Sequence, residues 1–153
     1  MMDLWIRKAT YQDIDIIYNW ANDPEVRKNS FNTNPIRYED HCKWYNTKMQ
    51  SPNTAIFVLM CGDIPVGQCR IDVDGEEGVI SYLVDKNYRN LGYGKILLNM
   101  VSEKIMNEYP EISMLVAEVK EDNISSRKVF LSLGYIENID KKKKVLTFRR
   151  NIK

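Results

Sequence analysis

The segment from Val79 to Met106 combines residue types that together can bind an anion. An apolar, β-rich run (Val79–Val84) precedes Arg89-Asn90-Leu91-Gly92-Tyr93-Gly94, and an amphipathic stretch follows. Glycines permit a tight turn and a close approach of the backbone to a ligand. The first N–H groups of a helix lack internal partners, and the helix dipole favours negative charge there. The order of strand, glycine-bearing turn and helix therefore predicts a phosphate-binding site.

Two nucleotide-binding motifs with similar glycines do not fit this segment. A P-loop requires GxxxxGK[ST], but Gly94-Lys95 is followed by Ile96, and no glycine stands five residues before Gly94. The dinucleotide fingerprint GxGxxG requires a third glycine where Leu97 stands. The pattern that remains is RxxGxG.

The RxxGxG pattern between a strand and a helix resembles the acyl-CoA signature of the GNAT acetyltransferase superfamily. A second element about thirty residues later supports the resemblance, with Glu118-Val119-x-x-x-Asn123-x-x-Ser126 followed by Phe130-Leu-Ser-Leu-Gly134-Tyr135. The resemblance covers nearly the whole chain. It implies one acetyltransferase domain over residues 1–153, with acetyl-CoA as cofactor.

The resemblance also implies how acetyl-CoA is bound. Backbone N–H groups of the RxxGxG loop hold the pyrophosphate, and the preceding strand pairs with the pantetheine arm. A backbone N–H near Leu83 or Val84 polarises the acetyl carbonyl. Asn123 matches the family residue that meets the pantetheine amides, although Asn before a helix is also a common N-cap. The predicted cofactor-binding residues are Leu83, Val84, Asp85, Arg89, Asn90, Leu91, Gly92, Tyr93, Gly94, Lys95, Asn123, Ser126 and Phe130.

Two of these residues have a purely structural alternative. Lys95 either adds positive charge near phosphate or is an ordinary solvated helix residue. Arg89 can stabilise the turn by donating to backbone carbonyls instead of contacting the cofactor.

The proton donor for the departing thiolate is not where relatives place it. Many relatives have a tyrosine seven residues after the Asn, but Phe130 stands there and cannot donate a proton. Tyr135 or Tyr82 takes this role, or the thiolate leaves unaided, since a CoA thiol resembles free Cys with a pKa of ~8.5.

The general base has several candidates. They are Glu118, Glu76, Asp72 and His41. Glu118 is expected on the strand beside the cofactor, and His41 has a suitable intrinsic pKa, although a packed role is commoner for a lone histidine. The predicted catalytic residues are Glu118, Tyr135 and His41.

The N-terminal half is expected to build the acceptor pocket. The run WxNDPxVR (Trp20–Arg27), then Ser30-Phe31 and an EDHxxW segment (Glu39–Trp44), resembles acetyltransferases of 4-amino nucleotide-linked sugars in bacterial nonulosonic acid pathways. Ribosomal-protein N-terminal acetyltransferases share the WxNDP part less completely. Aromatic rings could stack on a base or sugar, and arginines could meet phosphates, while most of these aromatics are expected in the core. The predicted substrate-binding residues are Trp20, Arg27, Phe31 and Trp44.

The acceptor class has two alternatives. A peptide α-amine acetyltransferase needs an acidic groove, and the arginines fit a phosphate-bearing acceptor better. A non-catalytic acyl-CoA sensor is the other possibility, because Phe130 replaces the usual tyrosine.

The composition of the chain limits the kinds of partner that it is expected to bind. The chain has 22 Lys+Arg and 21 Asp+Glu, a net charge of +1, so no nucleic-acid footprint is expected. No apolar run approaches the ~18 residues of a membrane span, and residues 1–10 do not resemble a signal peptide. Three cysteines and one histidine offer no recognisable metal set. We therefore expect a cytoplasmic monomer or homodimer that acts on a small-molecule amine, without metal.

The elements that must position these residues follow the order β-α-α-β-β-β-α-β-α-β-β. Helices are expected from Thr10 to Asn22, where Pro24 interferes, and over residues 39–49, 94–108 and 125–133. Strands are expected over residues 4–9, 55–60, 66–73, 79–84, 114–119, 135–139 and 145–149. The expected α/β fold is the GNAT fold, a central mixed and splayed β-sheet flanked by about four helices.

Overall fold

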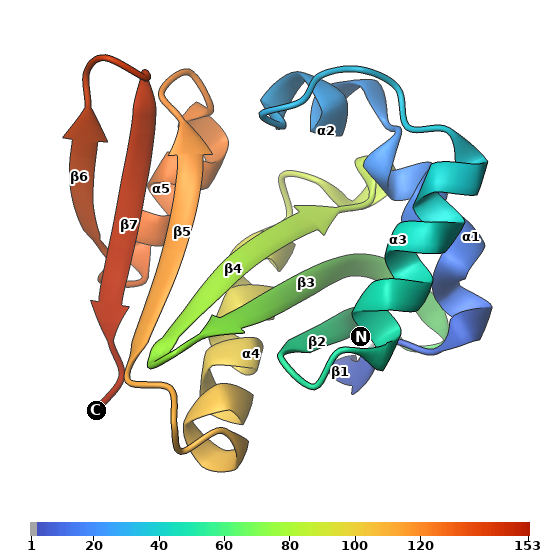
Figure 1. The fold of residues 1–153 in the computed structure, drawn as a ribbon, viewed down its shortest axis with the longest axis horizontal. Helices are drawn as coiled ribbons and strands as arrows, with labels where there is room; N and C mark the ends of the chain where they lie inside the picture. Colours follow the sequence, from blue (N-terminus) through green and yellow to red (C-terminus); the bar gives the residue numbers. More distant parts are fainter. Residues whose placement is uncertain (1–2) are drawn as a thin grey trace.

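The computed structural model describes residues 3–153, which form a seven-stranded mixed sheet (Figure 1). The strand order is β1-β2-β3-β4-β5-β7-β6, and every neighbouring pair is antiparallel except β4 with β5. The strands are β1 (Leu4–Lys8), β2 (Thr54–Cys61), β3 (Ile64–Asp74), β4 (Glu77–Val84), β5 (Met114–Lys120), β6 (Ile136–Asp140) and β7 (Val145–Asn151).

Helices cover both faces of this sheet. They are α1 (Ile14–Ala21), α2 (Pro24–Asn29), α3 (Tyr38–Gln50), α4 (Tyr93–Glu108) and α5 (Ile124–Ser132). Strand side chains alternate between faces. Val58 of β2 accordingly packs with Ile17 of α1 and Tyr45 of α3, whereas Phe57 packs in the cluster that holds Leu97 of α4. This two-sided burial explains why β2 is an almost continuous apolar run.

Strands β4 and β5 pair only where they begin. The parallel pairing covers Glu77–Met114, Gly78–Leu115 and Val79–Val116. Beyond these three pairs the strands diverge, as Figure 1 shows. The splayed sheet expected from the sequence is confirmed, and the second half of β4 lies at an open edge.

One helix was not expected from the sequence. Pro24 does follow the end of α1, but it also starts α2, where it occupies the first turn. The Asp23 carboxylate accepts hydrogen bonds from the N–H groups of Glu25 and Val26, at 3.0 and 3.2 Å. Proline is well suited to a first helical position. With six residues, α2 is too short to show periodicity.

The entry to α1 is fixed by a buried ion pair. Thr10 and Asp13 form a capping box at residues 11–13, as their spacing suggests. The Asp13 carboxylate also accepts two hydrogen bonds of 2.8 Å from the Arg7 guanidinium. The side chain of Asp13 is only 8% exposed, so β1 is tied to α1 by a largely desolvated pair.

Asp13→Asn should lower the free energy of unfolding by about 2–3 kcal/mol at pH 7, because it removes one partner of this pair. The hydrogen bonds from Arg7 hold the pKa of Asp13 below its usual range. The pair therefore stabilises the fold above the unfolded-state pKa of ~3.9 and loses its effect as pH falls through the folded-state pKa.

Chemical denaturation between pH 3 and 7 tests this. Wild type should lose stability in acid more steeply than Asp13→Asn. Asp63→Asn, in an exposed turn, is the control and should follow wild type. Parallel curves for wild type and Asp13→Asn would contradict the assignment.

Candidate active site

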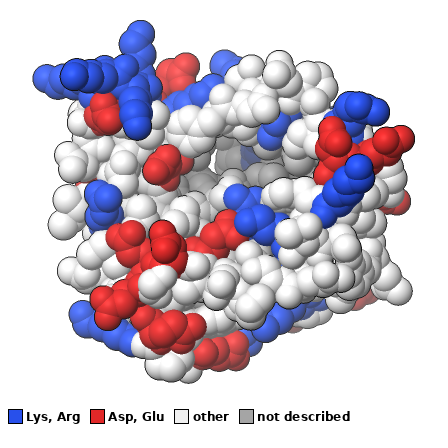
Figure 2. All heavy atoms as spheres, viewed as in Figure 1, with Lys and Arg blue, Asp and Glu red and all other residues white. Residues whose placement is uncertain are grey.

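A cleft of about 1300 Å³ lies where β4 and β5 diverge. Its walls come from β3, β4, β5, α2 with the loop after it, and the N-terminal ends of α4 and α5. Figure 2 shows this face hollowed near its centre, with acidic and basic side chains around the hollow. The N–H groups at the start of α4 and the open edge of β4 both border the cleft.

The RxxGxG loop has the geometry of an anion cradle. Asn90 and Gly92 both have left-handed backbones, with φ of +64° and +80°. Gly92 is the N-cap of α4, and the first intrahelical bond runs from Ile96 N–H to the Gly92 carbonyl. The N–H groups of residues 93–95 precede that bond and lie at the positive end of the helix dipole. A Cβ built on Gly92 meets no atom within 4 Å, so the space beside the loop is open to a ligand.

The side chain of Arg89 supports this loop from behind. Its Nη2 donates to Asp23 at 2.8 Å, and its Nε donates to the Val84 carbonyl at 3.2 Å. Arg89 is thus engaged in stabilising the turn, the alternative considered for it. Lys95 is exposed in the cleft and forms no ion pair within residues 3–153.

Three predicted ligand-binding residues lie outside the cleft. Trp20 is 5% exposed in the core, and its indole N–H donates to Asp85 at 2.8 Å. The Asp85 carboxylate is thereby engaged, and its own N–H donates to the Val66 carbonyl. The side chain of Leu91 is exposed away from the cleft. Trp20 is therefore corrected to a core residue, and Asp85 to a support of the loop.

The hydrogen bond of Asp85 distinguishes Leu83 from Val84. In an antiparallel pair, the N–H groups of successive residues point alternately toward and away from the partner strand. Asp85 N–H points to β3, so the N–H of Leu83 does as well, and that of Val84 points into the gap. Of the two, only Val84 N–H is directed where an acyl carbonyl would lie.

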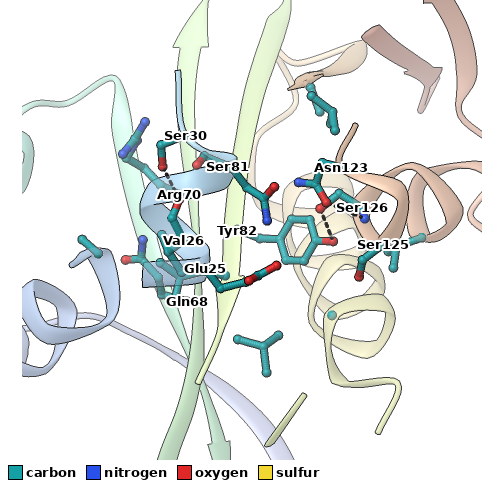
Figure 3. Close-up of a pocket in the computed structure, with 18 of the residues that line it drawn as sticks. Glu25, Val26, Ser30, Gln68, Arg70, Ser81, Tyr82, Asn123, Ser125 and Ser126 are labelled. Carbon is teal, nitrogen blue, oxygen red and sulfur yellow. Dashed lines mark hydrogen bonds between the residues drawn. The ribbon is translucent and has the colours of Figure 1, made fainter. Parts of the chain in front are cut away.

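The start of α5 forms the opposite wall. Asn123 caps the helix through its Oδ1, which accepts from the Ser126 N–H at 3.2 Å. The cap uses only the amide oxygen, so the Asn123 amide nitrogen can still meet a ligand in the cleft. The Ser126 hydroxyl lies 3.0 Å from the Tyr82 hydroxyl of β4, as drawn in Figure 3.

The candidate proton donors differ sharply in position. Tyr135 is 3% exposed, its ring packs edge-on against Phe130, and it does not line the cleft. Burial raises its pKa to about 12. Tyr135 is therefore corrected from proton donor to core residue. Phe130 is also buried and reaches the cleft only at its floor, beside Tyr82.

Tyr82 of β4 lines the cleft between these walls, as do Tyr88 and Tyr93 near the RxxGxG loop. Burial raises the pKa of Tyr82, which keeps its phenol protonated at neutral pH. Gly94 packs directly on its ring, because a Cβ at Gly94 would lie 3.0 Å from Tyr82 Cε2. The ring is thus held against the cofactor loop.

The candidate bases are also separated by the structure. Glu118 is exposed and lines the cleft from β5. Asp72 lies outside the cleft and is held by Lys48, Arg70 and Thr54 at 2.8–2.9 Å. Glu76 lies in the turn at the far end of β4. Neither therefore serves as the base: Asp72 is a structural residue, and Glu76 is an exposed turn residue outside the cleft.

His41 lines the acceptor end but is only 2% exposed. Its Nε2 donates to the Ile14 carbonyl at 2.9 Å, and its ring stacks on Tyr45. Burial lowers the pKa of His41, which weakens it as a base. The expected catalytic role is corrected to packing between α1 and α3.

Sequence reasoning missed Glu25, Gln68, Arg70 and Ser81, which all line the cleft (Figure 3). Glu25 belongs to the unexpected helix α2. The other three come from β3 and β4, where sequence analysis expected strands but assigned no site role to these side chains. Their paired register, Gln68 with Leu83 and Arg70 with Ser81, is the signal that places them on one face.

The acceptor wall contains the other predicted residues. Phe31 is 56% exposed, and the Arg70 guanidinium lies 5.2 Å above the Trp44 ring. Arg27 donates to the carbonyls of Ala21, Asn32 and Asn34 and to the Ser30 hydroxyl. Arg27 therefore shapes the loop that carries Phe31.

The chain belongs to the GNAT acetyltransferase family, because the model of the acetyltransferase (GNAT) domain matches residues 3–136. The family resemblance inferred from the RxxGxG motif is thereby confirmed. An uncharacterized N-acetyltransferase of Bacillus subtilis (strain 168), YfmK, is 28% identical over 95 residues. That alignment covers 61% of this chain and 62% of YfmK, so the chain spans less than two thirds of this curated relative.

Solved structures share the fold. A domain from Methanocaldococcus jannaschii DSM 2661 superposes with a TM-score of 0.88 at 19% identity, over 99% of this chain and 100% of that one. Spermidine N-acetyltransferase from Vibrio cholerae, in complex with CoA and spermine, has a TM-score of 0.85 at 14% identity, over 97% and 95%.

Residues 3–153 contain no cluster of three or more His, Cys, Asp or Glu side chains arranged to hold a metal ion. They also contain no helix with the length and apolar character needed to cross a bilayer.

Gly92→Val should abolish acetyl-CoA binding and leave the protein folded. A β-branched residue is strained at φ +80°, and its side chain would occupy the open space beside the loop. Gly75→Val is the matched control: Gly75 has φ +62° and equally open surroundings, but lies in the β3–β4 turn. Isothermal titration with acetyl-CoA measures both. Unchanged affinity in Gly92→Val would mean that the anion cradle lies elsewhere.

Asp23→Ala should weaken acetyl-CoA binding about three- to tenfold, since it frees Arg89 from behind the loop. It should also cost about 1 kcal/mol of stability through the lost cap of α2. Glu39→Ala, which removes an exposed 3.7 Å pair with Arg37, serves as control. Equal affinities in the two variants would show that the Asp23–Arg89 pair does not organise the loop.

Proposed function

We propose that the chain transfers an acetyl group from acetyl-CoA to the primary amine of a nucleotide-linked amino sugar. The observation that carries this proposal is the charge of Arg27 in the cleft wall. Its four hydrogen bonds all go to neutral oxygens, and no carboxylate of residues 3–153 forms an ion pair with it. Burial lowers its pKa, as expected for a cation without a counter-charge.

An uncompensated guanidinium beside the cleft favours an anionic ligand such as a diphosphate. The loop that Arg27 holds presents Phe31, and Trp44 lies on the same wall beneath Arg70. An exposed ring and a half-buried ring beside cationic groups suit a nucleobase linked to phosphates. The resemblance of the N-terminal motifs to amino-sugar acetyltransferases points the same way.

The residues around the gap divide the chemical work. Acetyl-CoA supplies the thioester carbonyl. Val84 N–H stabilises negative charge on the carbonyl oxygen, as an oxyanion donor. Tyr82, protonated and hydrogen-bonded to Ser126, gives its proton to the departing sulfur. The amine attacks the carbonyl carbon to form the C–N bond, and the C–S bond of the thioester breaks. Glu118 or Glu25, which both face the cleft, accepts the proton lost by the amine, directly or through water.

Glu25 and Glu118 also favour a second candidate. Two carboxylates in the cleft can attract an ammonium group, so a peptide α-amine or a polyamine is the alternative acceptor. The Vibrio cholerae enzyme with the same fold is named for spermidine.

A thiol-release assay with acetyl-CoA separates the acceptors. The panel contains a UDP-4-amino sugar, peptides with free α-amines and spermidine. We expect the largest kcat/KM for the UDP-4-amino sugar and competitive inhibition by UDP against that acceptor. Turnover of peptides or spermidine alone would overturn the proposal.

A further inference from the structure

Gln68 on β3 is a buried polar residue that the fold leaves unsatisfied. It is 5% exposed, it lines the cleft, and its Oε1 has no hydrogen-bond partner within residues 3–153. Nearly all buried polar groups in folded proteins are paired, and an unpaired one costs stability. An apolar side chain at this position would give a more stable fold. Folding stability therefore does not explain why an amide is present here.

The register of the sheet shows what Gln68 faces. It pairs with Val58 of β2 and Leu83 of β4, so the three side chains share one face. Val58 and Leu83 pack in the cluster formed with α1 and α3. Gln68 therefore belongs to the acceptor side of the sheet, one strand away from the gap between β4 and β5. Figure 3 draws it near Val26, with Tyr82 farther along the cleft.

This position separates Gln68 from the cofactor path. A pantetheine arm that pairs with β4 lies in the gap, in the plane of the sheet. Gln68 stands on β3 and projects from the face that α1, α2 and α3 cover. Its strand partner Leu83 directly precedes Val84, whose N–H points into the gap between β4 and β5. A ligand group that reaches Gln68 from the acceptor side therefore lies next to the reacting carbonyl.

We propose that Gln68 positions the acceptor amine by accepting a hydrogen bond from its N–H through Oε1. In the free protein this oxygen is closed to solvent, so the side-chain amide rotates to turn Oε1 into the cleft when the acceptor binds. This assignment rests on the proposed acetyl transfer to an amine, but not on which amine it is. A neutral oxygen suits the task, because it holds the amine without stabilising its unreactive ammonium form as a carboxylate would. The unpaired Oε1 lowers the stability of the free protein, and the hydrogen bond from the acceptor amine offsets this cost when the acceptor is bound.

Gln68→Leu keeps the size of the side chain and removes the acceptor oxygen. We expect it to be at least as stable as wild type in chemical denaturation, and to bind acetyl-CoA within twofold of wild type. Its kcat/KM for the acceptor should fall by about tenfold or more, the scale of one lost hydrogen bond to the reacting group. Gln12→Leu, at an exposed position outside the cleft, should change none of these values.

Gln68→Glu tests the positioning role separately. It restores an acceptor oxygen, so activity should return toward wild type, but the new charge stabilises the ammonium form. The rise of kcat/KM with pH should therefore shift to higher pH. A purely structural role for Gln68 does not predict this shift.

The acceptor in both tests is the UDP-4-amino sugar, or the peptide or spermidine if wild type turns over only that amine. Turnover of only a peptide or spermidine would overturn the proposed acceptor class. The two Gln68 variants, assayed with that amine, would still decide the role of Gln68. Unchanged kcat/KM in Gln68→Leu would overturn the assignment. So would a loss of stability, which would mean that Oε1 is bonded within the fold, or a parallel loss of acetyl-CoA affinity. Absence of turnover with every amine would overturn both proposals.

Discussion

The separation of β4 from β5 after three residue pairs determines most of this structure. Backbone N–H and C=O groups are strong hydrogen-bonding groups, and a sheet that opens must satisfy them in another way. Here β4 is held along its length by β3, and β5 by β7, so the sheet consists of two well-paired halves joined at a narrow end. The open end exposes N–H groups of β4, which makes the backbone itself available to a ligand.

A small number of polar contacts connects the halves across the open end. The Tyr82 hydroxyl meets Ser126 at 3.0 Å, and the Lys120 ammonium donates to the Lys28 carbonyl at 3.0 Å. The second contact joins the end of α2 to β5, so α2 and its loop form a roof over the cleft. Exposed polar contacts of this kind break more readily than a packed core. The contact between α2 and β5 is therefore weaker than the packing within the sheet.

Local signals predicted the fold and the glycine turn at the start of α4 well. The RxxGxG turn and the Thr10–Asp13 capping box each depend on residues close in sequence. Family resemblance then placed the splay in the sheet. Helix α2 was not predicted, because it is short and begins with a proline, a residue that commonly marks the end of a helix.

The acceptor side could not be predicted in the same way, because it depends on which face each side chain occupies. Trp20 and Trp44 are equally aromatic in sequence, yet the first lies in the core and the second in the cleft wall. Tyr135 follows Gly134, whose left-handed backbone (φ +85°) turns the chain so that the tyrosine packs beneath Phe130. Gln68 stands within an apolar strand, and only the pairing of β3 with β4 shows where it points.

The contact between Gly94 and Tyr82 has an evolutionary consequence. A Cβ at position 94 would lie 3.0 Å from the aromatic ring of Tyr82. The first turn of α4 and β4 therefore pack so closely here that the side chains at positions 94 and 82 compete for the same space. An increase in size at one position requires a decrease at the other. In a set of homologous sequences these two positions should vary together: an aromatic residue at position 82 should accompany glycine at position 94, and a larger residue at 94 should accompany a smaller one at 82.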